Sequence, residues 1–295
     1  MVVIDNKKNK EALFKSNDLI QKIWHSLGIR EQQIFALLIK QIQPFDTEFK
    51  MQKFTFTQIA KELGWTDGGN TRIRLMTALK NMRKICFWHR SPDNVNKLEL
   101  CGALGYAAID VREKTAEMML DKTLEPYLLG LRRKGNFTVV QFHYVVKANS
   151  RFTMPLYEYL RSKAFGRYTW QVENITITEL RGLLNAKPSQ DWRDFKKYAL
   201  NVATEEINRI TDMTIKYEPN KVGKSIVSVT FYCRRKRNSQ DKEEFDEQVN
   251  KESFENIYDD EREDLCSDLP DSYYDEYIAF EGFDDDNMEI EEFDD

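Results

Sequence analysis

Apolar residues between positions 16 and 44 recur every three or four residues, which is the spacing of helices with one buried face. Ser16, Asn17 and Asp18 form a helix-start signal ahead of an apolar run at Leu19, Ile20, Ile23 and Trp24. A second helix is predicted to end before Pro44, with its apolar face at Ile34, Leu37, Leu38 and Ile42.

One short pattern occurs twice. Thr55 with Gln58, and Thr176 with Glu179, each have the spacing of a capping box at the start of a short apolar helix. Superposing residues 57 and 178 aligns the apolar positions 59 with 180 and 63 with 184, at an offset of 121. Gly64 is a natural helix stop after the first copy. The offset predicts an internal repeat of a folded unit.

A longer amphipathic helix follows each capped helix. The first is predicted over Thr71–Ile85, with an apolar stripe at Leu75, Ala78, Leu79, Met82 and Ile85 and a polar stripe at Asn70, Arg74, Thr77, Asn81 and Lys84. The second is predicted over Trp192–Ile210. Its core face holds Trp192, Phe195, Ala199, Val202, Ala203, Ile207 and Ile210, and its outer face holds Arg193, Lys196, Lys197, Asn201 and Thr204.

Strand-like and helical segments complete each half. Strands are predicted at 85–90, 97–111, 117–121 and 137–146, with helices at 124–133 and 152–164 and a linker at 132–136. Strands at 214–217 and 226–233 flank a hairpin turn that carries Lys221 and Lys224. The fold class is therefore α+β, with an N-terminal winged-helix domain over 1–134, a C-terminal one over 135–238, and a tail over 239–295.

The formal net charge of −5 hides a strong asymmetry. Residues 239–295 hold 25 acidic and three basic residues, a net charge of −22, whereas the rest of the chain carries +17. Such an acidic segment cannot bury enough apolar area to offset its ordering entropy, so we predict a disordered tail. The basic body indicates a polyanionic partner.

A capped helix, a turn, a half-basic helix and a lysine-bearing hairpin together form a winged helix-turn-helix. The major groove admits one α-helix, in which Arg donates two bonds to guanine and Asn two bonds to adenine. The sequence therefore predicts duplex-DNA binding, chiefly by the helix Trp192–Ile210. The alternative is a packed helix with a solvated basic face. In the first half, the corresponding helix could serve dimerisation as readily as DNA contact.

Other chemistries find no support in the residue pattern. The three histidines (His25, His89 and His143) form no H-x-H pair, and no phosphate-binding G-x-x-x-x-G-K-[ST] loop occurs. Cys86, Cys101 and Cys233 are expected to be buried free thiols, and Cys266 completes the four cysteines. We therefore expect no enzyme activity, no cofactor and no metal. The polar N-terminus and the absence of a long apolar run predict a cytoplasmic protein without membrane contact.

Several segments resemble plasmid replication initiator proteins of the iteron-binding class, which act in plasmid replication by the theta mechanism. The resemblance rests on Ser16–Ile20, Leu156–Leu160, Trp192–Lys197, Ala203–Asp212 and Tyr217–Pro219, and it covers roughly residues 12–236. It implies two winged-helix domains. It also implies binding of double-stranded DNA at origin repeats (iterons), opening of an AT-rich segment, and recruitment of host replication initiation and helicase-loading proteins.

The resemblance further implies a homodimer, joined through the N-terminal domain and in equilibrium with monomer, that acts as an autorepressor of its own gene. The C-terminal helix would dominate affinity, which favours Arg193, Lys196 and Lys197 as contacts. Lys187 and Ser189, just before it, could hold phosphates. The matching N-terminal positions are Thr71, Arg72, Arg74, Lys80 and Lys84.

Two questions stay open at this level. A transcriptional repressor with the same fold and no initiation role is the alternative function, and the sequence does not separate it from an initiator. The acidic tail departs from the family pattern. Its tethered charge could compete with DNA for the basic body, or it could dock a host factor.

Overall fold

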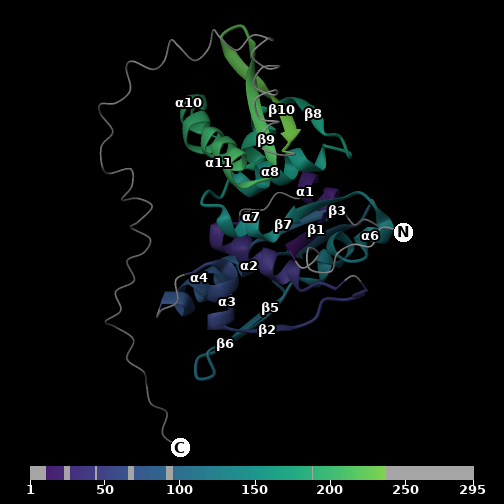
Figure 1. The fold of residues 1–295 in the computed structure, drawn as a ribbon, viewed down its shortest axis with the longest axis vertical. Helices are drawn as coiled ribbons and strands as arrows, with labels where there is room; N and C mark the ends of the chain where they lie inside the picture. Colours follow the sequence, from purple (N-terminus) through teal and green to yellow (C-terminus); the bar gives the residue numbers. More distant parts are fainter. Residues whose placement is uncertain are drawn as a thin grey trace, which may run out of the picture. The chain divides into compact units, whose positions relative to one another are not determined.

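The computed structural model describes residues 11–22, 27–43, 45–65, 70–90, 96–187 and 189–236, all within one compact unit (Figure 1). Several sequence predictions lie outside these residues: the helix positions Ile23 and Trp24, most of the loop after Trp65, His25, Cys266 and the acidic tail at 239–295. Among the described residues, no helix is long and apolar enough to span a bilayer.

The first winged-helix unit, called the N-terminal repeat here, runs from Ile29 to Met119. Its helices are α2 (Ile29–Lys40), α3 (Phe56–Leu63) and α4 (Asn70–Lys84). Its strands are β2 (Gln52–Thr55), β3 (Cys86–Arg90), β4 (Leu98–Gly102), β5 (Tyr106–Asp110) and β6 (Thr115–Met119). Strands β2, β6 and β5 form an antiparallel sheet in that order. The predicted capping box is confirmed, since Thr55 accepts from Gln58 N at 3.1 Å and Gln58 accepts from Thr55 N at 2.8 Å.

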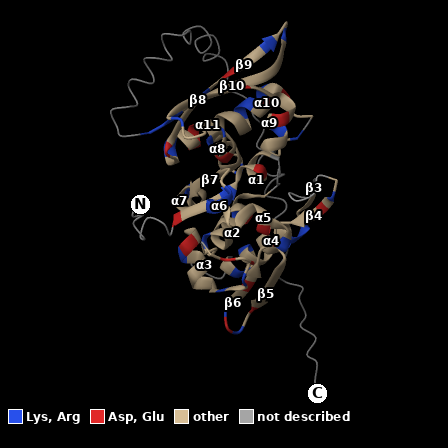
Figure 2. Ribbon diagram, turned by 90° about the vertical axis from the view of Figure 1, so that its right-hand side faces the viewer, with Lys and Arg blue, Asp and Glu red and all other residues tan. Residues whose placement is uncertain are grey.

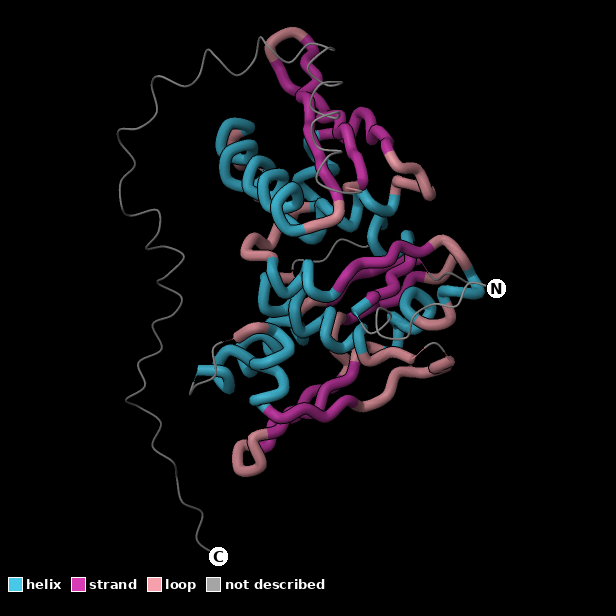
Figure 3. Tube along the Cα trace, viewed as in Figure 1, coloured by secondary structure: helices cyan, strands magenta, loops and turns pink. Residues whose placement is uncertain are grey.

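The second unit, called the C-terminal repeat here, runs from Thr153 to Arg235. Its helices are α8 (Thr153–Ser162), α9 (Ile177–Leu183), α10 (Trp192–Phe195), the π-helical segment η3 (Lys196–Asn201) and α11 (Val202–Ile210). Its strands are β8 (Thr169–Thr176), β9 (Met213–Val222) and β10 (Ser225–Arg235), paired in the order β8-β10-β9. The hairpin β9–β10 projects beyond the helices (Figure 3).

The two repeats share one chain path, which makes the protein a tandem winged-helix fold. In each, a helix precedes a strand that ends at a capping threonine, Thr55 or Thr176, and the last strand lies between the other two. The capped residues stand 121 apart, as the sequence predicted. One element has no counterpart: the hairpin β3–β4 is inserted between α4 and β5. In the C-terminal repeat, only Thr211 and Asp212 separate α11 from β9.

A third group of elements, called the connector here, joins the repeats. It comprises β1 (Ala12–Ser16), α1 (Asn17–Lys22), η2 (Lys122–Leu124), α5 (Glu125–Leu128), α6 (Leu131–Lys134), β7 (Phe137–Gln141) and α7 (Phe142–Lys147). Strand β1 pairs antiparallel with β7, from Ala12 opposite Gln141 to Ser16 opposite Phe137. This pairing joins residues on either side of the predicted domain boundary between residues 134 and 135. The boundary itself stays a prediction.

Buried polar contacts attach the C-terminal repeat to the connector. Lys15 on β1 donates to Glu158 on α8 at 2.6 Å, and both side chains are less than one-tenth exposed. On the same helix, Gln21 of α1 donates to Ser162 at 2.9 Å. The neighbouring Tyr157 instead donates to Asp212 at 2.7 Å, within its own repeat. Burial and that carboxylate raise the pKa of Tyr157 well above its usual range, so the phenol stays a donor.

Three predicted segments are wrong in type or extent. The strand 97–111 is broken into β4 and β5 because Ala103 and Leu104 are buried and the backbone turns at Gly105, where a Cβ would lie 2.9 Å from Leu120 O. The helix 124–133 breaks at Gly130, whose φ is +65°. The strand 137–146 stops at Gln141, and Phe142–Lys147 is helical.

Candidate nucleic-acid interface

The turn between α9 and α10 holds the helix-turn-helix of the C-terminal repeat in place. Arg181 on α9 donates to Gln190 O at 2.6 Å, and its guanidinium lies 5.6 Å from the centre of the buried Phe195 ring. Asp191 caps α10 by accepting from Trp192 N at 2.7 Å. The predicted Lys187 and Ser189 lie in this turn and are exposed. They therefore lie just before the first turn of α10.

The outer face of the helix presents two of the predicted cations. Arg193 and Lys197 are exposed and four residues apart, so they lie on one face a turn apart, while Lys196 is half-buried beside them. The ammonium of Lys197 lies 5.1 Å from the centre of the Tyr198 ring. A guanidinium and an ammonium at this spacing suit one base edge and one phosphate.

The π-helical segment η3 changes which residues face inward after Lys197. A π turn holds more residues than an α turn, so the faces beyond it are shifted. Leu200 is fully buried, whereas Val202, predicted in the core, is 39% exposed. Asn201 accepts a hydrogen bond from the Tyr217 hydroxyl on β9 and is half-buried. Its side-chain oxygen therefore links the helix to the sheet, and its role as a DNA contact stays a prediction.

Two polar residues of α11, Glu206 and Asn208, bond to neighbouring parts of the C-terminal repeat. Asn208 pairs with the backbone of Ile215, donating to its oxygen at 3.0 Å and accepting from its nitrogen at 2.7 Å. Buried Glu206 accepts from the backbone of Asn149 at 2.9 Å and Ser150 at 3.0 Å, and from the Thr153 hydroxyl at 2.6 Å. These side chains fix the helix against the sheet and against the start of α8.

The hairpin β9–β10 forms a wing that carries both predicted lysines. Lys221 lies at the end of β9 and Lys224 in the turn, where Gly223 has a φ of +62°, and both lysines are exposed. Figure 2 shows basic segments toward the tip of this hairpin. At its base, Asn220 donates to Asn174, Ser228 and Thr230 at 3.0–3.1 Å. That polar cluster fixes the direction in which the wing projects.

The N-terminal repeat presents a weaker face. Arg72, Lys80 and Lys84 are exposed on α4, but Arg74 is half-buried and already engaged. Thr71 is 2% exposed because it precedes the core residue Leu75 by one helical turn, so its prediction as a DNA contact is corrected. The exposed apolar residues Ile73 and Met76 lie between these bases.

The sequence prediction missed the wing of the N-terminal repeat. Strands β5 and β6 occupy the positions of β9 and β10, and exposed Arg112 and Lys114 lie in the turn between them. The sequence pattern over 97–111 predicts one continuous strand, which hides the hairpin. Recognising Gly105 as a break would have separated a hairpin with a basic tip.

The cysteines and His143 differ in how far they are exposed. Cys101 and Cys233 are buried as predicted, and burial raises the pKa of Cys101 to about 11 and that of Cys233 further, whereas Cys86 is exposed, contrary to the prediction. Burial and nearby Lys147 lower the pKa of exposed His143. The described residues contain no metal-binding group of three His, Cys, Asp or Glu.

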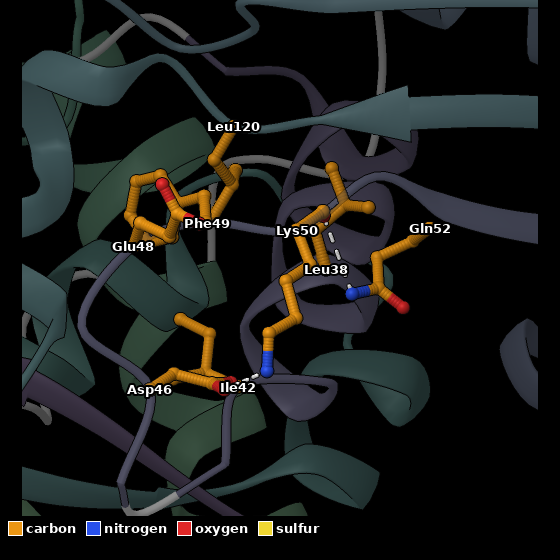
Figure 4. Close-up of a pocket in the computed structure, with 8 residues that line it drawn as sticks. All are labelled: Leu38, Ile42, Asp46, Glu48, Phe49, Lys50, Gln52 and Leu120. Atoms are coloured by element: carbon orange, nitrogen blue, oxygen red, sulfur yellow. Dashed lines mark hydrogen bonds and ion pairs between the residues drawn. The ribbon is translucent and has the colours of Figure 1, made fainter.

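One small cavity lies beside the end of α2, lined by Leu38, Ile42, Phe49, Leu120 and four polar residues (Figure 4). Its volume is about 10 Å³, which suits at most a single water molecule. Lys50 pairs with Asp46 across its rim, and that bond lowers the pKa of the Asp46 carboxyl.

Comparison with known proteins matches both repeats. The protein family described as "Initiator Replication protein, WH1" matches residues 12–161. The family described as "Initiator Rep protein, WH2" matches residues 176–233. The fold resembles the crystal structure of the Pi initiator protein in complex with iteron DNA, with a TM-score of 0.61, 17% identity, and coverage of 78% of this chain and 99% of the other. Domains 2 and 3 of RctB align over 71% of this chain and 83% of the other, with 14% identity and a TM-score of 0.45. No curated protein sequence matches the chain.

Proposed function

Because the chain belongs to the initiator replication protein family, we propose that it starts plasmid replication by binding repeated duplex sites at an origin and opening an AT-rich segment beside them. One observation carries the proposal. The C-terminal repeat combines an exposed Arg193–Lys197 face with a wing whose tip holds Lys221 and Lys224. The helix suits a major groove, and the wing suits the adjoining backbone.

The same proposal assigns a second role to the N-terminal repeat. Its α4 face mixes bases with exposed Ile73 and Met76, which suits a protein partner as well as DNA. We propose that it joins two copies in a dimer that represses the chain's own gene, and that the monomer loads onto origin repeats. Host helicase-loading proteins are the proposed partners, the proposed compartment is the cytoplasm, and no catalytic step is assigned to the chain.

The test is a gel-shift titration of the full chain against DNA from its own locus at two salt concentrations. Stepwise loading of several copies onto one fragment is expected, with affinity falling steeply as salt rises. Arg193→Ala should abolish the stepwise pattern at concentrations where Arg30→Ala, a change at an exposed arginine on α2, retains it. A single shifted species on an inverted repeat would indicate a repressor without an initiation role, and no specific shift would overturn the proposal.

A further inference from the structure

A second basic site lies away from the DNA-binding face, where the C-terminal repeat meets the connector. A cavity of about 340 Å³ is bounded by the end of α8, the start of β7 and the last residue of β10. Its volume falls within the range of about 300–1,000 Å³ that is typical of small-molecule pockets. It is far larger than the cavity of Figure 4.

Two arginines, Arg161 and Arg235, line this cavity, and each also holds a buried nitrogen without a described partner. Nη1 of Arg161 and Nε of Arg235 are both buried and lack a hydrogen-bond partner within the described ranges. The Arg161 side chain is only 16% exposed, and the nearest carboxylate, that of Asp212, is 3.8 Å from its Nη2. Asp212 is itself held by the Tyr157 hydroxyl. A ligand that brings oxygen acceptors into this cavity would be held by the two guanidiniums through charge-assisted hydrogen bonds.

The two guanidiniums are close enough to repel each other. Burial lowers the pKa of Arg235, and the positive charge of Arg161 lowers it further. Two partly buried guanidiniums at one cavity are an environment that a phosphate group neutralises, because its oxygens accept several charge-assisted hydrogen bonds at once.

The rim of the cavity adds an aromatic ring. Phe165 lines it and is 73% exposed, with a backbone φ of +46° that is costly for a residue with a side chain. A large apolar side chain held in this conformation at the mouth of an arginine-lined pocket provides a stacking surface for a planar base. A bare phosphate or carboxylate would fill only a small part of the space.

We propose that this cavity binds a free nucleotide, with its phosphate between Arg161 and Arg235 and its base on Phe165. The ligand would connect α8 with the end of β10. Helix α8 lies at the end of the first family match, residues 12–161, and β10 ends just beyond the second, residues 176–233. Binding there would stiffen the junction of the C-terminal repeat with the connector. The proposal is independent of DNA recognition, since none of these residues lies on the Arg193–Lys197 face.

Isothermal titration of the full chain with adenosine 5′-monophosphate tests it. One site per chain is expected, and Arg161→Gln or Arg235→Gln should weaken binding by about tenfold or more through loss of charge-assisted bonds. Arg30→Gln removes an exposed arginine on α2 and should leave the affinity unchanged. Thermal melting without ligand shows whether each variant is folded.

A second variant keeps the test decisive if the arginine changes disturb folding. Phe165→Gly places glycine at a left-handed φ and so relieves strain. It should weaken adenosine 5′-monophosphate binding about tenfold and leave binding of inorganic phosphate unchanged. Phe45→Gly, at a residue that is 92% exposed elsewhere, is the matched control.

Three results would overturn the proposal. The first is the absence of any nucleotide binding by the full chain. The second is nucleotide binding that appears only when three tail acids, Asp241, Glu243 and Glu244, are changed to amides. That result would mean that the acidic tail of the chain, and not a nucleotide, is the ligand of the cavity. The third is a single-stranded oligonucleotide that binds through the same arginines far more tightly than the mononucleotide.

Discussion

The N-terminal and C-terminal repeats use one chain path for two different surfaces. Both begin with a helix, a strand and a threonine-capped helix, and both end in a hairpin. In the C-terminal repeat the exposed Arg193 and Lys197 precede the exposed apolar residues Tyr198 and Val202, whereas on α4 the exposed Ile73 and Met76 separate the bases. The N-terminal repeat also inserts the hairpin β3–β4, where Trp88 pairs with Leu100 and both are at least half exposed. A shared scaffold therefore sets the geometry, and a few surface positions set the partner.

The largest expected effect concerns how the C-terminal repeat is held. Lys15→Met would leave Glu158 buried without its partner, at a cost of about 3–5 kcal/mol in unfolding free energy. Tyr157→Phe, which breaks a bond inside the repeat, should cost less, about 1.5–3 kcal/mol. Urea denaturation followed by circular dichroism measures both. Full stability in Lys15→Met would show that the ion pair does not fasten this repeat, and the double change Lys15→Met with Glu158→Leu should recover much of the loss.

The next effect compares the two helices as DNA readers. Arg193→Ala should relax preference at one base position by about 1–3 kcal/mol, because it would remove the proposed bidentate contact to guanine. Arg72→Ala on α4 should change affinity less and leave base preference intact. Competition binding against a set of single-base variants of the site separates the two arginines. Equal loss on specific and random DNA for Arg193→Ala would contradict its assignment to a base.

The capping boxes offer a test in which the repeats should behave alike. Thr55→Ala and Thr176→Ala each remove a side chain that accepts from the third residue of its helix, so each should cost about 1 kcal/mol in unfolding free energy. Thermal and urea unfolding would check this. A cost confined to one variant would show that only one of the capped helices depends on its box.

The smallest effect concerns single phosphate contacts. Lys197→Ala should weaken binding to all DNA sequences alike and reduce the slope of log affinity against log salt by about one. Lys114→Ala, at the wing of the N-terminal repeat, is the matched change there. An unaltered slope in Lys197→Ala would place that ammonium off the phosphate backbone, and an equal change in both variants would mean that both repeats grip DNA.

Local patterns made the helical part of this fold predictable. A threonine three residues before Gln or Glu fixes a helix start through contacts within one turn, so both capping boxes could be located from sequence. The aromatic and β-branched residues of segment Phe142–Lys147 predict a strand, yet the segment is helical. It is helical where the ring of Phe142 packs under the ammonium of Lys40, 4.2 Å from the ring centre. Such a contact between distant segments leaves no local signal.

The candidate site was predictable only in outline. The basic helix and the lysine-bearing wing follow from residue type and spacing, so Arg193, Lys197, Lys221 and Lys224 lie on the surface. Asn201 could not be assigned from a regular helical period, because the π-helical segment η3 shifts the faces around it. The cavity at Arg161 and Arg235 is lined by residues that lie 74 positions apart in the sequence, so no local sequence motif predicts it.

The pairing of β1 with β7 affects the order in which the chain folds during its synthesis. Ala12 lies opposite Gln141, 129 residues later, and Lys15 meets its partner 143 residues later. Translation at about 5–20 residues per second makes the first strand wait roughly 6–26 s for its partner. All of the N-terminal repeat is synthesised within that interval. Strand β1 therefore pairs only after the N-terminal repeat has had time to fold, and before the C-terminal repeat has been made.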